Sequence, residues 1–321
     1  MNKIIIIGSG FSSAVLSKNL KTENILIFDK SRGPGGRSST RRVEHVGVFD
    51  HGLQFVSPKE KKFELFLKQH LESFIKEWNG KFLIFEDNKK IDKKKYIGKS
   101  GNNDFVKNLI SKNVYYQKEL ASIKRVSKKW FLEFNDNSKQ ECDKLILTIP
   151  LEQCQKIILP LNLDFKVIGS MEPNLTIMVG LDKSLGIQAN GFKFEKNSIL
   201  SWAANESSKI RSENNPDLEL WTLQSSLFFA QKKFQDYRSN KEEVINLMVG
   251  EFLNLFNIKN TKIVHKDIHG WLYAFKKENF SQKFYWNEEI NLGICGDWMC
   301  GSKAEDAWSS ASALADQINN S

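Results

Sequence analysis

The chain has 321 residues, of which 40% are hydrophobic, and its formal net charge is +9. This length can bury a large core, in one big domain or in two interlocked ones. No apolar run approaches the roughly 18 to 20 residues that a membrane-spanning helix needs. The excess positive charge lies in lysines among Asn and Ile residues rather than in a recognition motif, so we expect neither a membrane nor a nucleic-acid partner.

The cysteines predict neither a disulfide framework nor a metal site. They are scattered, with no CxxC pair and no histidine at metal-ligand spacing, at Cys142, Cys154, Cys295 and Cys300. This usage suits a reducing compartment, so we expect a cytoplasmic protein without a bound metal.

The first 30 residues predict a strand, a glycine-rich turn, a helix and a second strand, at 3–8, 11–20 and 24–28. In the turn, Gly8 permits a sharp bend and Gly10 lets the backbone approach a pyrophosphate at the helix N-terminus. Asp29 ends the second strand, where it can accept a hydrogen bond from a ribose hydroxyl. This unit predicts a dinucleotide site, whose further members are Phe11, Ser12, Ser13 and Lys30.

The remaining elements alternate between helical and strand patterns. We expect helices at 60–78, 103–110, 228–237, 242–256 and 302–318, and strands at 81–85, 120–126, 130–134, 144–149 and 290–295. This order predicts an α/β fold of mixed α+β character with discontinuous domains. A Rossmann-like nucleotide domain is expected from 1–57, 108–160 and 288–321, and an interleaved substrate domain from 58–107 and 161–287.

Two segments after Asp29 favour FAD over NAD as the dinucleotide. Gly35, Gly36 and Arg37 come too soon for another Rossmann strand, and they suit a loop folded over a pyrophosphate, with the guanidinium on the phosphates or the flavin edge. The segment 50–55 (DHGLQF) predicts a short strand in which Gly52 lets a flat ring approach. Alone, the glycine pair also fits an ordinary turn.

The C-terminal block predicts a second part of the same site. Gly296 and Asp297 follow an apolar strand, and Ser302 with Glu305 predicts a capping box that opens the last helix. Small side chains along that helix permit close packing, and its N-terminal amides can stabilise negative charge on a reduced flavin. Alone, the pattern also fits a capped packing helix.

At this point the chain resembles the renalase-like branch of the FAD-dependent amine oxidase superfamily. The resemblance spans most of the chain and is carried by GSGFSS, FDKSRGPGGRSSTRR, FDHGLQF, YIGKSGNNDF, LSWAANESSK, LWTLQSS, HGWLYA and ICGDWMCGSKAEDAWSSA. It implies a two-domain fold with noncovalent FAD. The residues implied to hold the cofactor or line its ring are Gly8, Gly10, Ser13, Asp29, Arg37, Gly52, Leu53, Gln54, Leu120 (by its backbone, near the adenine), Gly296, Asp297, Glu305, Asp306, Ala307 and Trp308.

This sequence departs from the family pattern at several positions. Ser13 and Asp306 stand where glycine is more usual, and Ser100 and Asn102 interrupt a Pro-Gly-Met around Gly101. Gly270 and Leu272 occupy positions that often carry arginine in bacterial relatives. These last two bear on substrate specificity.

The expected chemistry needs no protein nucleophile, because a flavin can itself accept a hydride. Cys300 lies near the presumed flavin, but inert packing is the simpler interpretation. Aromatic faces and amides of the middle segments are expected to line the substrate cavity. The candidates are Trp202, Asn205, Trp221, Gln224, His269, Trp271 and Tyr273, the last three sharing one strand face by their period-2 spacing.

The resulting hypothesis is an FAD oxidase acting on a small reduced molecule, with oxygen as electron acceptor and a monomer favoured. The resemblance implies a dihydropyridine such as an isomer of reduced NAD(P). An amine substrate is the first alternative, and a flavin-binding redox sensor or partner-binding protein with little turnover is the second.

Overall fold

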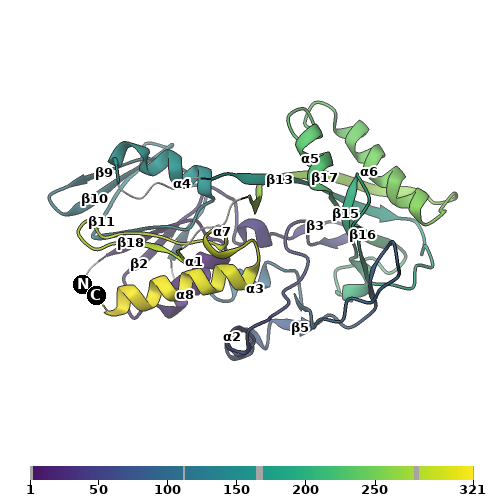
Figure 1. The fold of residues 1–321 in the computed structure, drawn as a ribbon, viewed down its shortest axis with the longest axis horizontal. Coiled ribbons are helices and arrows are strands. Elements are labelled where there is room, and N and C mark those ends of the chain that lie inside the picture. Colours follow the sequence, from purple (N-terminus) through teal and green to yellow (C-terminus); the bar gives the residue numbers. More distant parts are fainter. Residues whose placement is uncertain (1–2, 111–112, 164–168, 278–281, 321) are drawn as a thin grey trace.

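The computed structural model describes residues 3–110, 113–163, 169–277 and 282–320. Two six-stranded sheets form the centres of two lobes (Figure 1). Strand β13 (Met171–Leu181) connects them: Met171 packs into a core of the first lobe, whereas Leu175 and Ile177 pack into the core of the second.

The first sheet is a Rossmann-like sheet with the strand order β18-β19-β12-β1-β2-β8. All neighbouring pairs are parallel except the edge pair β18–β19. Its central strand has the sequence IIII and is buried throughout, as a parallel strand covered on both faces requires. The bounds are β1 Ile4–Ile7, β2 Ile25–Phe28, β8 Asn113–Tyr115, β12 Lys144–Leu147, β18 Tyr285–Asn287 and β19 Leu292–Ile294.

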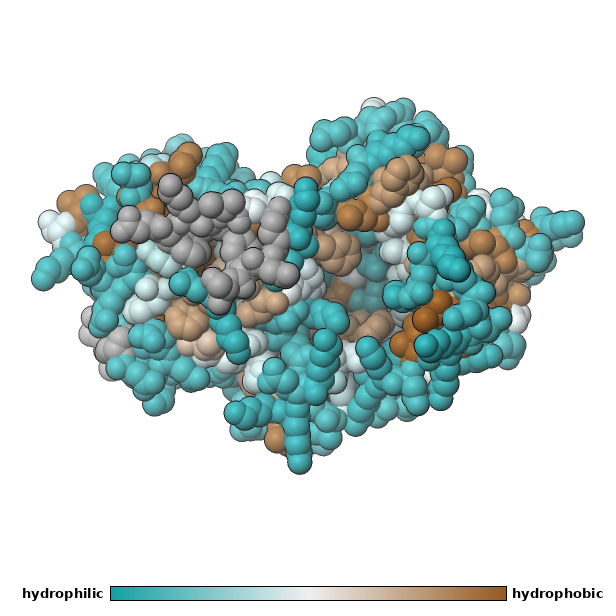
Figure 2. All heavy atoms as spheres, viewed as in Figure 1, coloured by the Kyte–Doolittle hydropathy of each residue, from teal (hydrophilic) through white to brown (hydrophobic). Residues whose placement is uncertain are grey.

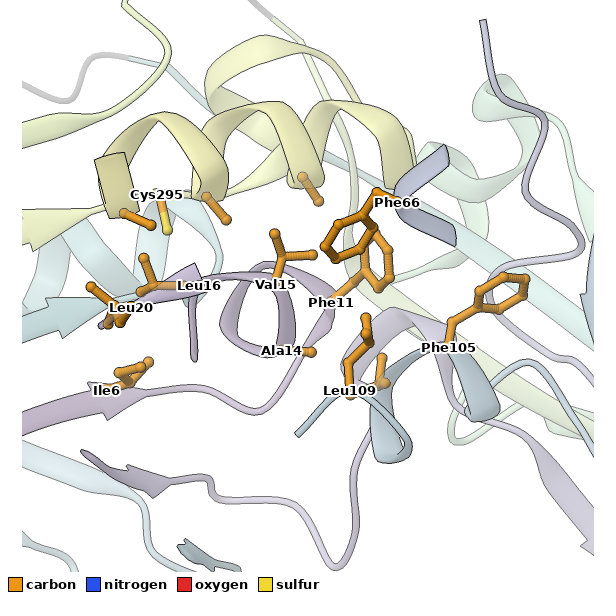
Figure 3. Packing of buried hydrophobic residues seen from close by; sticks show 14 of the residues in the cluster. Ile6, Phe11, Ala14, Val15, Leu16, Leu20, Phe66, Phe105, Leu109 and Cys295 are labelled. Carbon is orange, nitrogen blue, oxygen red and sulfur yellow. The ribbon is translucent and has the colours of Figure 1, made fainter. Parts of the chain in front are cut away.

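Helices α1 (Phe11–Asn19) and α8 (Ala304–Asn320) cover one face of this sheet. Val15 and Leu16 of α1 belong to the same buried cluster as Ala311 and Ala315 of α8, and Figure 3 shows the two helices packed side by side. The short alanine side chains allow the close approach that the sequence predicted.

The opposite face is covered by a three-stranded meander, with α4 and α7 packed into the same core. Ile5 and Ile7 turn toward it, while Ile4 and Ile6 face the helices, as the alternation of a strand dictates. Its strands and the neighbouring helices are β9 Leu120–Val126, β10 Lys129–Phe134, β11 Lys139–Cys142, α4 Leu151–Ile158 and α7 Asp297–Cys300.

The second sheet has the order β17-β13-β16-β15-β14-β6 and is antiparallel except for the pair β14–β6. One face is apolar and packs on α5 and α6, with Ile177, Leu223 and Trp221 in its core. The opposite face carries the polar residues described below. The bounds are β6 Phe82–Ile84, β14 Gly191–Lys193, β15 Leu200–Asn205, β16 Glu219–Ser225, β17 Ile263–Lys276, α5 Leu227–Lys233 and α6 Lys241–Leu255.

Three predicted helices are shorter than their patterns. The expected helix 60–78 ends at Leu71 as α2 (Lys61–Leu71), and 75–77 form strand β5 (Ile75–Glu77), because that segment pairs with β7 (Tyr96–Gly98). The helix expected at 103–110 is limited to α3 (Asp104–Lys107), and the one expected at 228–237 ends at Lys233. Tertiary pairing outweighs local periodicity in the first case.

The fold class is the predicted one, but segment 58–107 does not belong to one lobe. Phe63 and Phe66 of α2 pack in the same core as α1 and α8, whereas β6 joins the second sheet. The remaining short elements are the hairpin β3 (Arg41–Val43) and β4 (Gly47–Phe49). In the described ranges, no helix is both long and apolar enough to cross a bilayer.

Substitution of Gly8 by alanine tests whether the first turn of the fold requires glycine. Gly8 has a φ of +104°, and a Cβ there would lie 2.7 Å from Thr148 Oγ1. We expect Gly8→Ala to lower the free energy of unfolding by about 1–3 kcal/mol. The control is Gly250→Ala in α6, where a Cβ meets nothing within 4 Å and the gain should be about 0.5–1 kcal/mol. Urea denaturation measures both, and equal effects would contradict the account.

Candidate functional site

The glycine turn and the second glycine loop contact each other and leave the Cβ position of Gly10 open. Gly10 precedes the first turn of α1, and a Cβ built there meets no atom within 4 Å. Gly35 N donates to Ser9 O at 3.2 Å, and a Cβ on Gly36 would lie 3.5 Å from Gly10 Cα. Ser13 Oγ in helix α1 is buried, and no residue that the structure describes forms a hydrogen bond with it. The helix N-terminus therefore offers free N–H groups and room for an anion.

Asp29 lies at this turn, as predicted. Its Oδ2 accepts hydrogen bonds from Ser9 N at 2.5 Å and Ser9 Oγ at 2.8 Å, and its Oδ1 accepts from Ser31 N at 2.7 Å. Lys118 N donates to Asp29 O, which brings the chain leading into Leu120 alongside. Lys30 points outward and pairs with Glu119 at 3.6 Å.

The two chain ends meet at an ion pair between Arg37 and Asp297. Arg37 Nη1 donates to Asp297 Oδ2 at 2.8 Å and to Ala274 O at 3.1 Å, and Nη2 donates to Asp297 Oδ1. Both terminal nitrogens of Arg37 are therefore engaged by the protein. We expected its guanidinium on the phosphates or the flavin edge, and instead it bridges the glycine loop to the C-terminal segment.

The backbone of Arg37 also fixes segment 50–54, which we predicted to line the flavin ring. Leu53 N donates to Arg37 O at 2.8 Å, and a Cβ on Gly52 would lie only 2.1 Å from that oxygen. Position 52 therefore requires glycine because the Arg37 carbonyl approaches it closely. We expected a flat ring to impose this requirement. Gln54 is buried, and its Oε1 has no partner among the described residues.

The capping box predicted at the start of α8 is wrong. Asp306 Oδ2 accepts hydrogen bonds from Ser302 N and Lys303 N at 3.0 and 2.9 Å, so Asp306 caps the helix. Glu305 reaches outward instead, accepting from the backbone N–H groups of Lys59 and Glu60.

The residues around α8 hold that helix end in place. Gly296 N donates to Ser310 Oγ at 3.0 Å, Ala307 is buried, and Trp308 packs on Phe63 with ring centroids 5.3 Å apart. Asp306 therefore has a structural role at the helix start.

Four side chains form one row across the polar face of the second sheet. The register pairs Trp202 with Gln224, Gln224 with Thr176, and Thr176 with His269. Gln224 Nε2 donates to Gly52 O at 3.0 Å, so the row faces segment 50–54 of the first lobe. Figure 2 shows the surface hollowed between the two lobes.

Three rings close one end of this row. Those of His51 and Trp271 are stacked, with centroids 5.3 Å apart, and His269 lies 4.2 Å from Trp271 and 4.8 Å from His51. Trp271 Nε1 donates to His51 O at 2.8 Å. Burial lowers the pKa of His51 to about 3 and that of His269 to about 4, so both rings are neutral near pH 7.

Three substrate-cavity candidates lie elsewhere. Trp221 is fully buried against Phe252 in the core beneath α6, because it is one residue out of phase with Gln224. Asn205 caps its own turn by accepting from Ser208 N at 3.0 Å. Tyr273 packs on the meander-side core, beyond a bulge in the β13–β17 pairing.

Sequence reasoning missed a buried cluster of four charges behind Gly52. It consists of Asp50, Glu206, Lys209 and Arg211, all with side chains at most 1% exposed. The sequence did carry a signal for this cluster. Asp50 lies within FDHGLQF, and Glu206 and Lys209 lie within LSWAANESSK. None of the three had a role in the expected substrate cavity.

The comparisons with known proteins agree with this geometry. A family model described as an NAD(P)-binding Rossmann-like domain matches residues 6–69. A presumed protoporphyrinogen oxidase from Exiguobacterium sp. 255-15 superposes with a TM-score of 0.76 at 10% identity, over 99% of each chain.

Two further solved structures have the same fold. A putrescine oxidase redesigned in its cofactor binding superposes with a TM-score of 0.68 at 9% identity, over 100% of this chain and 99% of its own. A fatty acid isomerase from P. acnes that produces CLA gives 0.68 at 11% identity, over 99% of this chain and 98% of its own. At these identities the likeness establishes the fold.

Gly10 separates binding from folding. Its backbone φ of −84° suits any residue, and its Cβ position is open. We expect Gly10→Ala to leave the unfolding free energy within about 0.5 kcal/mol of the wild type. Its dinucleotide affinity should fall at least ~10-fold, because the methyl group takes the space that the pyrophosphate needs. Fluorescence titration of FAD checks this, and unchanged affinity would place the pyrophosphate elsewhere.

The lowered pKa values of His51 and His269 predict that the free energy of unfolding decreases in acid. Their pKa values are lower in the folded chain than the ordinary 6.5, so the unfolded state takes up protons first and stability falls as pH drops from about 6.5 toward 4. His51→Phe keeps a ring beside Trp271 and removes one such group. Its stability should fall less steeply, by at most about 1.4 kcal/mol per pH unit.

Chemical denaturation between pH 7 and pH 4 measures the two slopes. The control is His45→Gln, because His45 is exposed and its loss should leave the slope unchanged. A His51→Phe variant as acid-sensitive as the wild type would show that this ring is not held neutral.

Proposed function

We propose that the protein binds FAD noncovalently and is an oxidoreductase that removes a hydride from a small reduced substrate whose reacting ring is uncharged. The observation that carries this proposal is that the Gly36 loop contacts the Gly10 turn, where the Cβ position is open, while Arg37 of that loop pairs with Asp297. The polar row of the second sheet faces the first lobe through the contact of Gln224 with Gly52.

The residues present fit an FAD molecule by three observations. The Cβ position of Gly10 is open at a helix N-terminus, which suits a pyrophosphate. Asp29 is half-buried at the end of β2, with carboxylate lone pairs left for a ribose. Gln54 Oε1 and Trp202 Nε1 are buried without hydrogen-bond partners in the described part of the chain, as groups that face a polar ring would be.

The proposed cofactor residues therefore have distinct tasks. The first helix turn binds phosphate through its N–H groups, and Asp29 binds the ribose. Arg37 and Asp297 hold the glycine loop and the C-terminal segment together. When bound, the flavin supplies the hydride acceptor. The remaining members are Gly8, Phe11, Ser12, Ser13, Lys30, Gly35, Gly36, Leu53, Leu120, Gly296, Glu305, Asp306, Ala307 and Trp308.

The cavity-facing row favours a neutral, flat reacting ring over a cationic group. Trp202, Gln224 and His269 offer aromatic surface and neutral hydrogen-bonding groups but no carboxylate. Thr176 of the same row is fully buried, and its hydroxyl donates to Asn174 Oδ1 at 3.1 Å. His51 and His269 are uncharged near pH 7 because burial lowers each pKa. The buried carboxylates nearest Gly52, Asp50 and Glu206, are already paired with Lys209 and Arg211. A protonated amine would find no free counter-charge in this row.

We therefore favour a dihydropyridine, the class that the renalase-like resemblance suggests, over an amine. The oxidase names of two solved structures with this fold support hydride removal, since one is a presumed protoporphyrinogen oxidase and another a putrescine oxidase. Molecular oxygen as electron acceptor, a cytoplasmic location and a monomeric state complete the proposal.

Anaerobic stopped-flow reduction tests the reaction. FAD-loaded protein should bleach when mixed with isomers of reduced NAD(P), and should bleach much more slowly with putrescine or benzylamine. Faster bleaching by the amines would reverse the substrate assignment. Stable FAD that no donor reduces would contradict turnover and leave a redox-sensing or partner-binding role.

A matched pair of variants locates the reaction. Gln224→Leu removes the donor to Gly52 O and should slow bleaching ~10-fold or more, whereas Gln188→Leu changes an exposed glutamine and should leave it unchanged. Equal rates in both variants would remove the row from the proposed chemistry.

A further inference from the structure

The four-charge cluster behind Gly52 is closed on itself. Asp50 Oδ2 accepts hydrogen bonds from Lys209 Nζ at 2.8 Å and Arg211 Nη2 at 2.6 Å. Glu206 lies 2.9 Å from Lys209 Nζ and 3.3 Å from Arg211 Nη1. Two carboxylates and two cations thus balance, as buried charges must.

Neutral donors complete the carboxylates of this cluster. Asp50 Oδ1 accepts from Thr40 Oγ1 at 2.9 Å and Asn102 N at 2.8 Å, and Glu206 Oε1 accepts from Thr222 Oγ1 at 2.9 Å. Burial alone would raise the pKa of Asp50, but Arg211 and Lys209 together hold it well below its usual range. Asp50 is therefore an anion throughout the working pH range.

Three conspicuous sequence segments meet in this cluster although they are far apart in the chain. Asp50 comes from FDHGLQF, Asn102 from YIGKSGNNDF, and Glu206 with Lys209 from LSWAANESSK. Asn102 also donates through Nδ2 to Leu53 O at 2.6 Å and accepts from Gly98 N at 2.9 Å. Asn102, a departure from the family pattern, is thus a structural link between these segments.

The cluster leads directly to segment 50–54. Gln54 Nε2 donates to Asp50 O, Gln224 Nε2 donates to Gly52 O at 3.0 Å, and Asn102 Nδ2 donates to Leu53 O. With His51 O, which accepts from Trp271 Nε1, four of the segment's carbonyls are therefore held by side chains. The Asp50 side chain is anchored in the second lobe. Lys209 and Arg211 supply that anchor.

Stability alone does not account for such a cluster. Burying four charges has a desolvation cost that well-packed apolar side chains would avoid. What the charges supply is direction, because an ammonium and a guanidinium fix the Asp50 carboxylate from two sides. The benefit lies in the placement of the backbone that follows Asp50.

We propose that this cluster is a positioning device for segment 50–54, with Lys209 as its main positioning residue. It sets the Gly52 carbonyl and the Gln54 amide at the face where the FAD ring and the substrate meet. This inference rests on the proposed function for its chemical meaning, but its structural part concerns the protein without cofactor.

Lys209→Met and Lys209→Arg test the proposal as a pair. Hydrogen–deuterium exchange of the cofactor-free protein reports on the backbone of residues 49–55. Lys209→Met should raise exchange in this segment at least ~10-fold, and Lys209→Arg should restore much of the protection, because it keeps a cation beside Asp50. Lys129→Met, which removes an exposed pair with Glu141, is the control and should match the wild type.

The FAD-loaded variants give the second measurement. In Lys209→Met the limiting rate of flavin reduction should fall ~10- to 100-fold, while the half-saturating donor concentration changes less than ~3-fold, since Lys209 does not face the row. Should Lys209→Met fail to fold, Glu206→Gln combined with Lys209→Met keeps the cluster neutral and is expected to show the same effects more weakly.

The outcomes separate this inference from the proposed function. Wild-type exchange and wild-type reduction rates in Lys209→Met, or in the double variant, overturn the positioning role even if FAD binds. If Lys209→Met raises exchange only in residues 49–55 while the wild-type protein does not bind FAD, the positioning role is supported and the proposed function is overturned. A variant that loosens the entire second lobe equally, with no local effect, also overturns the positioning role.

Discussion

The ion pair between Arg37 and Asp297 is the contact on which the candidate site depends. It joins residues 260 positions apart, at the end of one glycine loop and at the start of the C-terminal helical segment. The ion pair also affects segment 50–54 through the Arg37 backbone, because Arg37 O accepts a hydrogen bond from Leu53 N and so orients that segment. The Arg37 side chain is 31% exposed and that of Asp297 only 9%, so the attraction within the pair is offset by the desolvation of its charges. The importance of the ion pair is geometric, since it joins the glycine loop to the C-terminal segment beside segment 50–54.

In the second lobe, strand alternation places the apolar core residues on one face of the sheet and the polar residues on the other. Residues such as Ile177, Leu223 and Trp221 point to α5 and α6 and form an apolar core. Their neighbours Thr176, Thr222 and Gln224 point the other way, toward the first lobe. Glu206 and Lys209 come from the loop after β15, so the same side of the sheet bears both the polar row and the buried charges. Polar groups buried between lobes need specific partners, and this fixes how the lobes meet.

Local chemistry explains which features the sequence predicts. The Gly8–Gly10 turn, Asp29 and the alanine stripe of α8 depend on residues close in the chain, and the structure places them as expected. Features set by distant pairing were missed. The helix expected at 60–78 ends early because residues 75–77 pair with β7. Trp221 faces the core because the strand register, rather than the residue type, decides on which face of the sheet a side chain lies. The charge cluster joins segments more than 150 residues apart, which no local pattern reveals.

The visible absorption spectrum of freshly purified protein tests the central claim most directly. The account predicts bands of an oxidised flavin near one equivalent per chain, with intact FAD released when the protein is denatured. A colourless protein that also refuses added FAD would contradict it, since the convergence of Gly10, Gly36 and Asp297 would then serve another ligand. A flavin that stays attached after denaturation would contradict noncovalent binding.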